Sequence, residues 1–143
     1  MFDSQRTNRA ADRSADAAHP LVHHLPTVGI VTSMALAVVI ALLSLMPVDL
    51  SRTPPVIGID KIFHFVAYAA LVFPVVVTRP RRWVWAVASA IAFGGVIEIV
   101  QAQVGREADW ADVLANALGA GIGAWAGIAI HRAVAARFRP KRT

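Results

Sequence analysis

The sequence predicts an all-α fold, an integral membrane four-helix bundle with both termini in the cytoplasm. Hydrophobic residues make up 57% of the 143-residue chain, more than the roughly 45 to 50% usual in soluble domains. Charged residues are segregated along the chain, and four apolar stretches lie between them. Each stretch is close to the roughly 20 residues that an α-helix needs to cross a bilayer.

The four predicted membrane spans are residues 28–46, 62–77, 83–104 and 113–130. Because hydrocarbon cannot hydrogen-bond free backbone N–H and C=O groups, each span must be a helix. The second span is short, but Asp60 and Lys61 can extend it by a turn, since the long lysine side chain can place its ammonium at the interface.

The basic residues set the orientation. Of the 14 lysines and arginines, three precede the first span, three lie between the second and third spans, five follow the fourth, and only three lie on the other side. Because cytoplasmic segments carry the excess of Lys and Arg, both termini are predicted to be cytoplasmic. The first span is not interpreted as a cleaved signal peptide, since its end, Ser44-Leu45-Met46-Pro47, lacks a small-x-small cleavage pattern.

Composition also excludes several kinds of function. The chain has no cysteine, which removes a disulfide framework and thiolate chemistry. Its net charge of +5 is explained by the cytoplasmic segments, and basic residues interleaved with aromatics on a soluble surface are missing. We therefore expect membrane lipids as partners and no nucleic acid.

Three regions follow from these patterns. Residues 1–27 are predicted to be a disordered cytoplasmic arm, because they mix polar and charged residues without apolar periodicity. Residues 28–131 form the four-helix transmembrane domain, and residues 132–143 form a basic cytoplasmic tail. Three histidines lie in the arm, and no metal-binding function is assigned to them.

The fourth span carries a ridge of small residues at intervals of four, which are Ala115, Gly119, Gly123 and Gly127. Such a ridge lets another helix backbone approach closely. Packing within the chain is the expected use of the ridge. A homo-oligomer that meets through Gly119, Gly123 and Gly127 is the alternative.

Polar residues form one stripe on the second span and another on the third. At 100° per residue, Asp60, His64 and Tyr68 share a face of the second span. Glu98 and Gln101 share a face of the third. Glu98 lies roughly 9 Å below the end of its helix, at a depth comparable to that of His64.

The start of the fourth span adds Asp109, Asp112 and Asn116, which continue onto the glycine ridge. The three stripes therefore point to one site at the extracytoplasmic surface. Glu98 is its strongest functional candidate, because a carboxylate within the membrane costs roughly 2.5 to 3.5 kcal/mol and must be paired, protonated or in contact with water.

These residues also have structural explanations. Asp60, Asp109 and Asp112 can cap helix N-termini, where carboxylates accept hydrogen bonds from free N–H groups. Interhelical hydrogen bonds, a satisfied buried hydroxyl or ordinary loop pairing can account for the remaining residues, which are Gln101, Asn116, Tyr68 and Arg106.

Two blocks of the sequence resemble the VanZ-like family of membrane proteins. The segment from Asp60 to Tyr68 reads D-K-x-x-H-F-x-x-Y, and the region from Glu98 to Gly119 reads E-x-x-Q, then G-R, then D-x-x-D-x-x-x-N-x-x-G. The resemblance implies four helices whose signature residues face a shared site. The family takes its name from a member associated with resistance to the glycopeptide teicoplanin, which acts at the outer envelope of Gram-positive bacteria. The resemblance implies no particular reaction, and no resistance function is carried over.

The favoured function is that of a non-enzymatic cell-envelope protein that binds an amphiphilic or lipid-linked ligand at the outer leaflet. In this hypothesis Lys61 and Arg106 hold anionic headgroups. Gln101 and Asn116 supply orienting amides.

Two alternatives stay open. The first is an intramembrane hydrolase or transferase in which His64 is a general base oriented by Asp60 or Glu98, with Arg106 stabilising negative charge. One version of it places a metal on His64, Glu98 and Asp112, although a single histidine in the cluster leads us to expect no metal and no cofactor. The second alternative is proton or ion conduction starting at Glu98 and His64.

Overall fold

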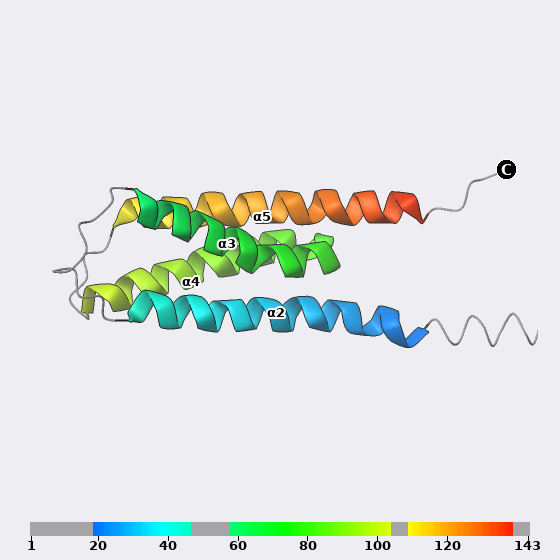
Figure 1. Ribbon diagram of the computed structural model, residues 1–143, viewed down its shortest axis with the longest axis horizontal. Helices are drawn as coiled ribbons and strands as arrows, with labels where there is room; N and C mark the ends of the chain where they lie inside the picture. Colours follow the sequence, from blue (N-terminus) through cyan, green and yellow to red (C-terminus); the bar gives the residue numbers. More distant parts are fainter. Residues whose placement is uncertain (1–18, 47–57, 104–108, 139–143) are drawn as a thin grey trace, which may run out of the picture.

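The computed structural model describes residues 19–46, 58–103 and 109–138, which form helices and no strand. The elements in chain order are α2 (His19–Leu45), α3 (Ile59–Thr78), the short 3-10 helix η1 (Pro80–Arg82), α4 (Trp83–Gln103) and α5 (Trp110–Arg137) (Figure 1). Each of the four α-helices is long and apolar enough to cross a membrane. The predicted all-α fold with four membrane helices is confirmed, whereas the cytoplasmic location of both termini stays a prediction.

The first and last membrane helices, α2 and α5, are longer than their predicted spans. Helix α2 begins at His19, within the segment 1–27 predicted to be a cytoplasmic arm, and residues 1–18 of that arm lie outside the described residues. Pro20 falls in the first turn, where its missing N–H costs nothing because the first four N–H groups have no helical partner. Helix α5 continues to Arg137, past the predicted end at residue 130, in a segment rich in alanine and arginine, which are strong helix formers.

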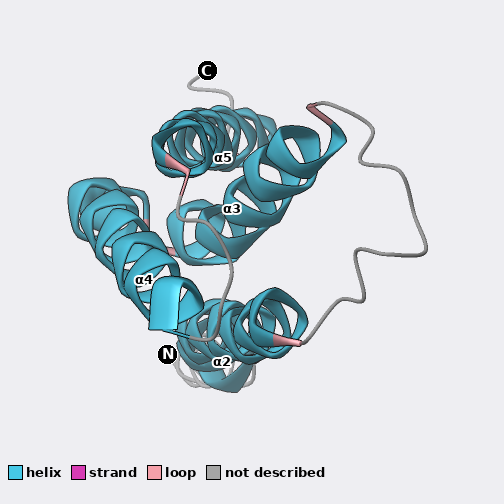
Figure 2. Cartoon of the chain, turned by 90° about the vertical axis from the view of Figure 1, so that its left-hand side faces the viewer, coloured by secondary structure: helices cyan, strands magenta, loops and turns pink. Residues whose placement is uncertain are grey.

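Helix α3 lies at the centre of the bundle and contacts each of the other three helices. Viewed from the end, α5, α4 and α2 surround it (Figure 2). Helices α3 and α5 both begin at the same end and run parallel (Figure 1). The core that they bury includes Tyr68, Val72 and Val76 on α3 and Ala120 and Ala124 on α5.

The small-residue ridge of α5 packs against α3 of the same chain. A Cβ atom added at Gly119 or Gly123 would overlap the backbone of Phe65 or Ala69, respectively, and one added at Gly127 would come within 3.0 Å of Val76 Cβ. The expected packing of the ridge within the chain is confirmed. A homo-oligomer through the same three glycines would have to displace α3 and stays a prediction.

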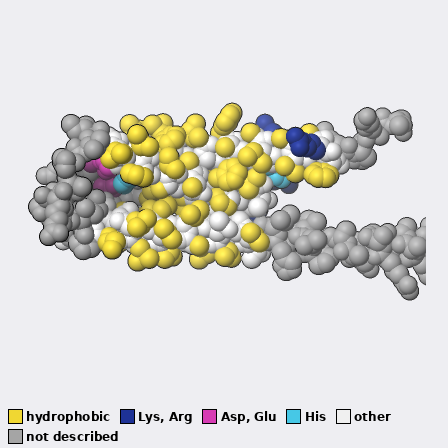
Figure 3. All heavy atoms as spheres, viewed as in Figure 1, with side chains coloured by type: hydrophobic (Ala, Val, Ile, Leu, Met, Phe, Trp, Pro, Cys, Tyr) yellow, Lys and Arg dark blue, Asp and Glu magenta, His cyan; other side chains and the backbone are white. Residues whose placement is uncertain are grey.

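Helix α2 also packs closely against α3 at a small residue, Gly29. Gly29 faces the backbone of Pro74, and one turn further along, Ser33 Oγ donates a hydrogen bond of 2.7 Å to Leu71 O. The face of the bundle seen in Figure 3 is largely apolar, with acidic side chains at one end and basic side chains at the other. This is the surface expected of helices packed by small residues within lipid.

The α3 and α5 contact predicts a clear difference between two glycines of one helix. Gly123→Ala should lower the free energy of unfolding by about 1 to 3 kcal/mol, because the added methyl group forces the two backbones apart. Gly121 has open space around it, so Gly121→Ala should be neutral or slightly stabilising. Unfolding in detergent, followed by the fluorescence of the four tryptophans, measures both; equal destabilisation would contradict the packing described.

Candidate functional site

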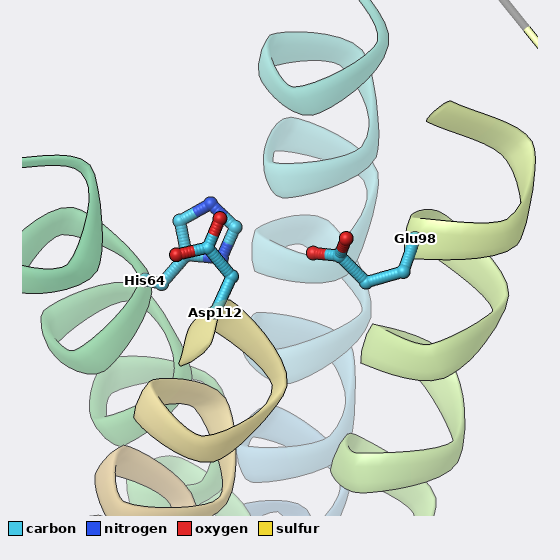
Figure 4. Close-up of side chains that lie close together, drawn as sticks. All are labelled: His64, Glu98 and Asp112. Atoms are coloured by element: carbon cyan, nitrogen blue, oxygen red, sulfur yellow. The ribbon is translucent and has the colours of Figure 1, made fainter. Parts of the chain in front are cut away.

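The polar residues predicted to converge do lie together, at one end of the bundle. Helix α3 contributes His64 near its beginning, α4 contributes Glu98 near its end, and α5 contributes Asp112 in its first turn (Figure 4). The three side chains point toward one another across the space between the helices (Figure 4). Their ligand atoms all lie within 4.8 Å of one another.

Glu98 is the deepest carboxylate of the site, and its side chain is only partly satisfied. The residue is 6% exposed. Its Oε2 accepts a hydrogen bond of 3.3 Å from the backbone N–H of Asp109. Its Oε1 is buried and has no hydrogen-bond partner within the described part of the chain. A buried carboxylate oxygen without a partner is costly, so the fold keeps Glu98 at the expense of stability.

His64 and Asn116 form the second polar contact between α3 and α5. His64 Nδ1 lies 3.2 Å from Asn116 Oδ1, and Asn116 is 2% exposed. Gly94 on α4 makes room for this pair, because a Cβ atom there would come within 2.9 Å of Asn116 Nδ2 and 3.1 Å of the Tyr68 hydroxyl. The absence of a side chain at residue 94 thus lets three helices place polar groups side by side.

Tyr68 closes the site one turn of α3 below His64. It is 2% exposed, and its ring packs on Phe93 with 6.2 Å between centroids. The layer beneath it is apolar, formed by Val72, Val76 and Ala124. Tyr68 and this apolar layer therefore form the floor of the polar site, its closed inner end.

Lys61 lies at the rim, surrounded by acidic side chains. Its Nζ lies 2.7 Å from Asp109 Oδ2, 3.2 Å from Asp60 Oδ2 and 3.4 Å from Asp112 Oδ1. The ammonium of Lys61, together with the Ala111 N–H, holds the pKa of Asp109 below its ordinary value. The positive charge expected to bind anionic headgroups is thus already offset by carboxylates of the same chain.

The capping explanation holds for one of the three aspartates. Asp109 is the N-cap of α5, and its Oδ1 accepts a hydrogen bond of 2.8 Å from Ala111 N. Asp112 lies in the first turn of α5. Asp60 lies in the first turn of α3, whose N-cap is Gly58 with a φ of 90°, a left-handed conformation that glycine adopts without cost. The interpretation of Asp60 as an N-cap is therefore wrong.

The end of α2 also belongs to the site, which sequence reasoning missed. Gln101 on α4 donates a hydrogen bond of 2.9 Å from Nε2 to Ser44 O. The last carbonyls of any helix lack a partner within the helix, but the sequence does not say which side chain will reach them. Arg106, the remaining predicted site residue, lies outside the described residues.

Charge and residue type limit what this arrangement can bind. The described site combines four carboxylates, those of Asp60, Glu98, Asp109 and Asp112, with one ammonium. It is acidic overall, and at its buried end Glu98 forms no ion pair with a lysine or arginine of the described residues and has His64 beside it. A cation or a hydrogen-bond donor is the complementary species.

Comparison with known proteins agrees with the resemblance in the two signature blocks. The family model described as VanZ/LLP1 matches residues 3–131. The chain belongs to the VanZ/LLP1 family. No curated protein matches the chain, and no solved structure does. Together with its four long apolar helices, VanZ/LLP1 membership makes it a multi-pass membrane protein.

Two substitutions separate the roles of Asp109 in this VanZ/LLP1 family member. Asp109→Asn should lower the melting temperature only slightly, because asparagine is as good an N-cap as aspartate and only the contact with Lys61 is lost. Asp109→Ala should lower it by several degrees, since it also removes the cap. Thermal unfolding in detergent gives the melting temperature of each variant. A larger decrease for Asp109→Asn than for Asp109→Ala would mean that the ion pair contributes more to stability than the cap.

Proposed function

We propose that this VanZ/LLP1 family member is a non-enzymatic protein of the cell membrane, with both termini cytoplasmic, that binds the polar group of an amphiphilic or lipid-linked envelope ligand at its extracytoplasmic end. The observation that carries the proposal is Glu98, whose carboxylate points toward His64 and Asp112 (Figure 4) and whose buried Oε1 has no hydrogen-bond partner among the described residues. A group from outside the chain would supply the missing hydrogen bond.

The gradient of exposure supports a ligand that enters from the membrane surface. The side chains of Asp60 and Asp109 are about half exposed, that of Asp112 is 14% exposed, and Glu98 is buried. A headgroup could therefore pass the rim and reach Glu98 while its hydrocarbon stays in the bilayer. An amphiphile meets both conditions.

An apolar groove that begins below the site and extends toward the basic end of the bundle, with Arg82 and Trp85 in its lining, could take a hydrocarbon portion of the ligand. The groove has a volume of about 420 Å³ and runs between α2, α3 and α4, with Met34, Leu71 and Phe93 among its lining residues. Phe93 lines the groove and packs on Tyr68, the floor of the polar site. The groove thus meets the polar site at the layer of Tyr68 and Phe93 and otherwise runs away from it, so a hydrocarbon chain would have to pass this layer to fill it.

The charge distribution favours a polar group that donates hydrogen bonds or carries positive charge. Lys61 has three carboxylate partners, so its ammonium is a weak anchor for an anionic headgroup. Asn116 and Glu98 lie deeper and present an amide and a carboxylate. Amine or hydroxyl groups would complement them.

An intramembrane hydrolase or transferase is the second candidate, and one observation favours it. His64 lies beside two carboxylates, so it could act as a general base on a water molecule, with Glu98 or Asp112 orienting the imidazole. Proton or ion conduction is less well supported, because the buried layer below Tyr68 is apolar.

The binding proposal predicts a loss of co-purified ligand on a single neutralising substitution. Glu98→Gln should reduce the amount of bound amphiphile by about tenfold or more, since a hydrogen bond to a charged group is worth roughly 1.5 to 3 kcal/mol. Val96→Ala, at an exposed residue of the same helix that lines neither the polar site nor the groove, is the control. Lipid extracts of the purified proteins are compared by mass spectrometry; the same lipid content in wild type and Glu98→Gln would refute the proposal.

The orientation can be tested separately because the chain has no cysteine. Thr143→Cys should react with a membrane-impermeant maleimide only after the membrane is opened, and Ser51→Cys should react in intact cells. The physical reason is the excess of basic residues on the cytoplasmic side. Labelling of Thr143→Cys in intact cells would place the site on the cytoplasmic face.

A further inference from the structure

We propose that His64, Glu98 and Asp112 form a binding site for a divalent transition-metal cation. The three residues come from three different helices, so the site exists only in the folded bundle. This inference goes beyond the proposed ligand-binding function and does not depend on it, because metal binding can be measured without any lipid.

The ligand atoms are already close to the spacing of a metal site. They lie within 4.8 Å of one another, whereas ligands at about 2.1 Å from one ion lie roughly 3 to 3.5 Å apart. Side-chain rotations that move each ligand atom by about 1 Å would bring the three atoms to the spacing of a metal site. The view in Figure 4 shows the carboxylates of Glu98 and Asp112 approaching from opposite sides, with the imidazole beside them.

Glu98 supplies evidence that is independent of the clustering. Its Oε1 is buried and unpartnered among the described residues, on a residue that is 6% exposed. Burying such an oxygen costs stability unless a cation binds it or a hydrogen-bond donor contacts it. A bound cation satisfies this oxygen and the negative charge at the same time.

Neighbouring groups position His64 and Asp112, the other two ligands, for metal binding. Asn116 Oδ1 lies 3.2 Å from His64 Nδ1, an arrangement in which Nδ1 carries the proton and Nε2 is free to bind the metal. Such a hydrogen bond from the second ring nitrogen is the usual partner of a metal-binding histidine. Lys61 contacts Oδ1 of Asp112, which leaves Oδ2 for the ion.

The donor set indicates which cations fit. One imidazole nitrogen and two carboxylates suit zinc or manganese, whereas calcium and magnesium prefer ligand sets made of oxygen alone. Three protein ligands leave at least one position open, as in catalytic zinc sites. A water molecule or a hydroxyl oxygen of a ligand could occupy that position.

The experiment is a titration of the purified full-length protein with Zn²⁺ and with Mn²⁺ after removal of metals by a chelator. The protein carries no histidine tag, and His19, His23 and His24 are replaced by alanine so that the N-terminal histidines cannot contribute. Isothermal calorimetry should give one ion per chain for the parent, and the electron paramagnetic resonance signal of Mn²⁺ should change on binding. Ca²⁺ should bind at least about tenfold more weakly, because of the nitrogen ligand.

Glu98→Gln, His64→Gln and Asp112→Asn should each abolish stoichiometric binding. Asn116→Ala should weaken it by about 10 to 100-fold, as expected for the loss of a group that orients a ligand. Asp60→Asn is the matched control, since it removes an exposed carboxylate of the same cluster that is not a ligand; its affinity should change by less than a factor of three or so. Circular dichroism without metal confirms that each variant is folded.

Several results would overturn the proposal. No saturable binding by the parent would do so, as would equal weakening in Asp60→Asn and Glu98→Gln, which indicates an adventitious ion only. If Glu98→Gln fails to fold, His64→Gln and Asp112→Asn decide the outcome. Lipid loss in Glu98→Gln without metal binding by the parent would support the proposed function and reject the metal site.

Discussion

The close contact between α3 and α5 is the constraint on which the rest of the structure depends. Gly119 and Gly123 let the α5 backbone lie against Phe65 and Ala69, which fixes the parallel register of the two helices. One turn nearer the acidic end, that register places Asn116 beside His64, and a further turn on it places Asp112 beside Lys61. Packing deep in the membrane therefore determines which polar groups meet at the surface.

Helix α4 completes the site because it also approaches through a glycine. Gly94 lies against Asn116 and Tyr68, and Glu98, one turn further, reaches the space between α3 and α5. Small residues thus act twice: they allow helices to associate without a hydrophobic driving force, and they leave room for polar side chains. The resulting site holds a buried carboxylate oxygen that the described chain leaves unsatisfied, a cost that a purely structural role would have no reason to keep.

Much of this could be predicted because the sequence carries two signals, the length of its apolar stretches and the helical spacing of its polar residues. Apolar length identifies the spans, and a 3.6-residue repeat places His64, Glu98 and Asn116 on inward faces. Helix ends were less predictable, since the extensions to His19 and Arg137 project beyond the apolar spans that hydropathy detects. The three carboxylate partners of Lys61 depend on side-chain conformation in the assembled bundle.

The contribution of α2 could not be foreseen for a different reason. Nothing in the sequence fixes how an apolar helix is rotated about its axis when it is exposed to lipid over most of its surface, as α2 is. Its contact with the site runs through the backbone carbonyl of Ser44, a group that every residue has. Only the packed bundle reveals it.

The central claim is that Glu98 is maintained for a partner outside the chain, and the stability of Glu98→Gln without ligand or metal tests it most directly. Glutamine can still accept the hydrogen bond from Asp109 N–H, and it removes a buried carboxylate whose Oε1 has no partner among the described residues. The account predicts that the variant is at least as stable as wild type, by up to about 1 to 3 kcal/mol in the free energy of unfolding. A variant clearly less stable than wild type would show that Glu98 serves the fold itself.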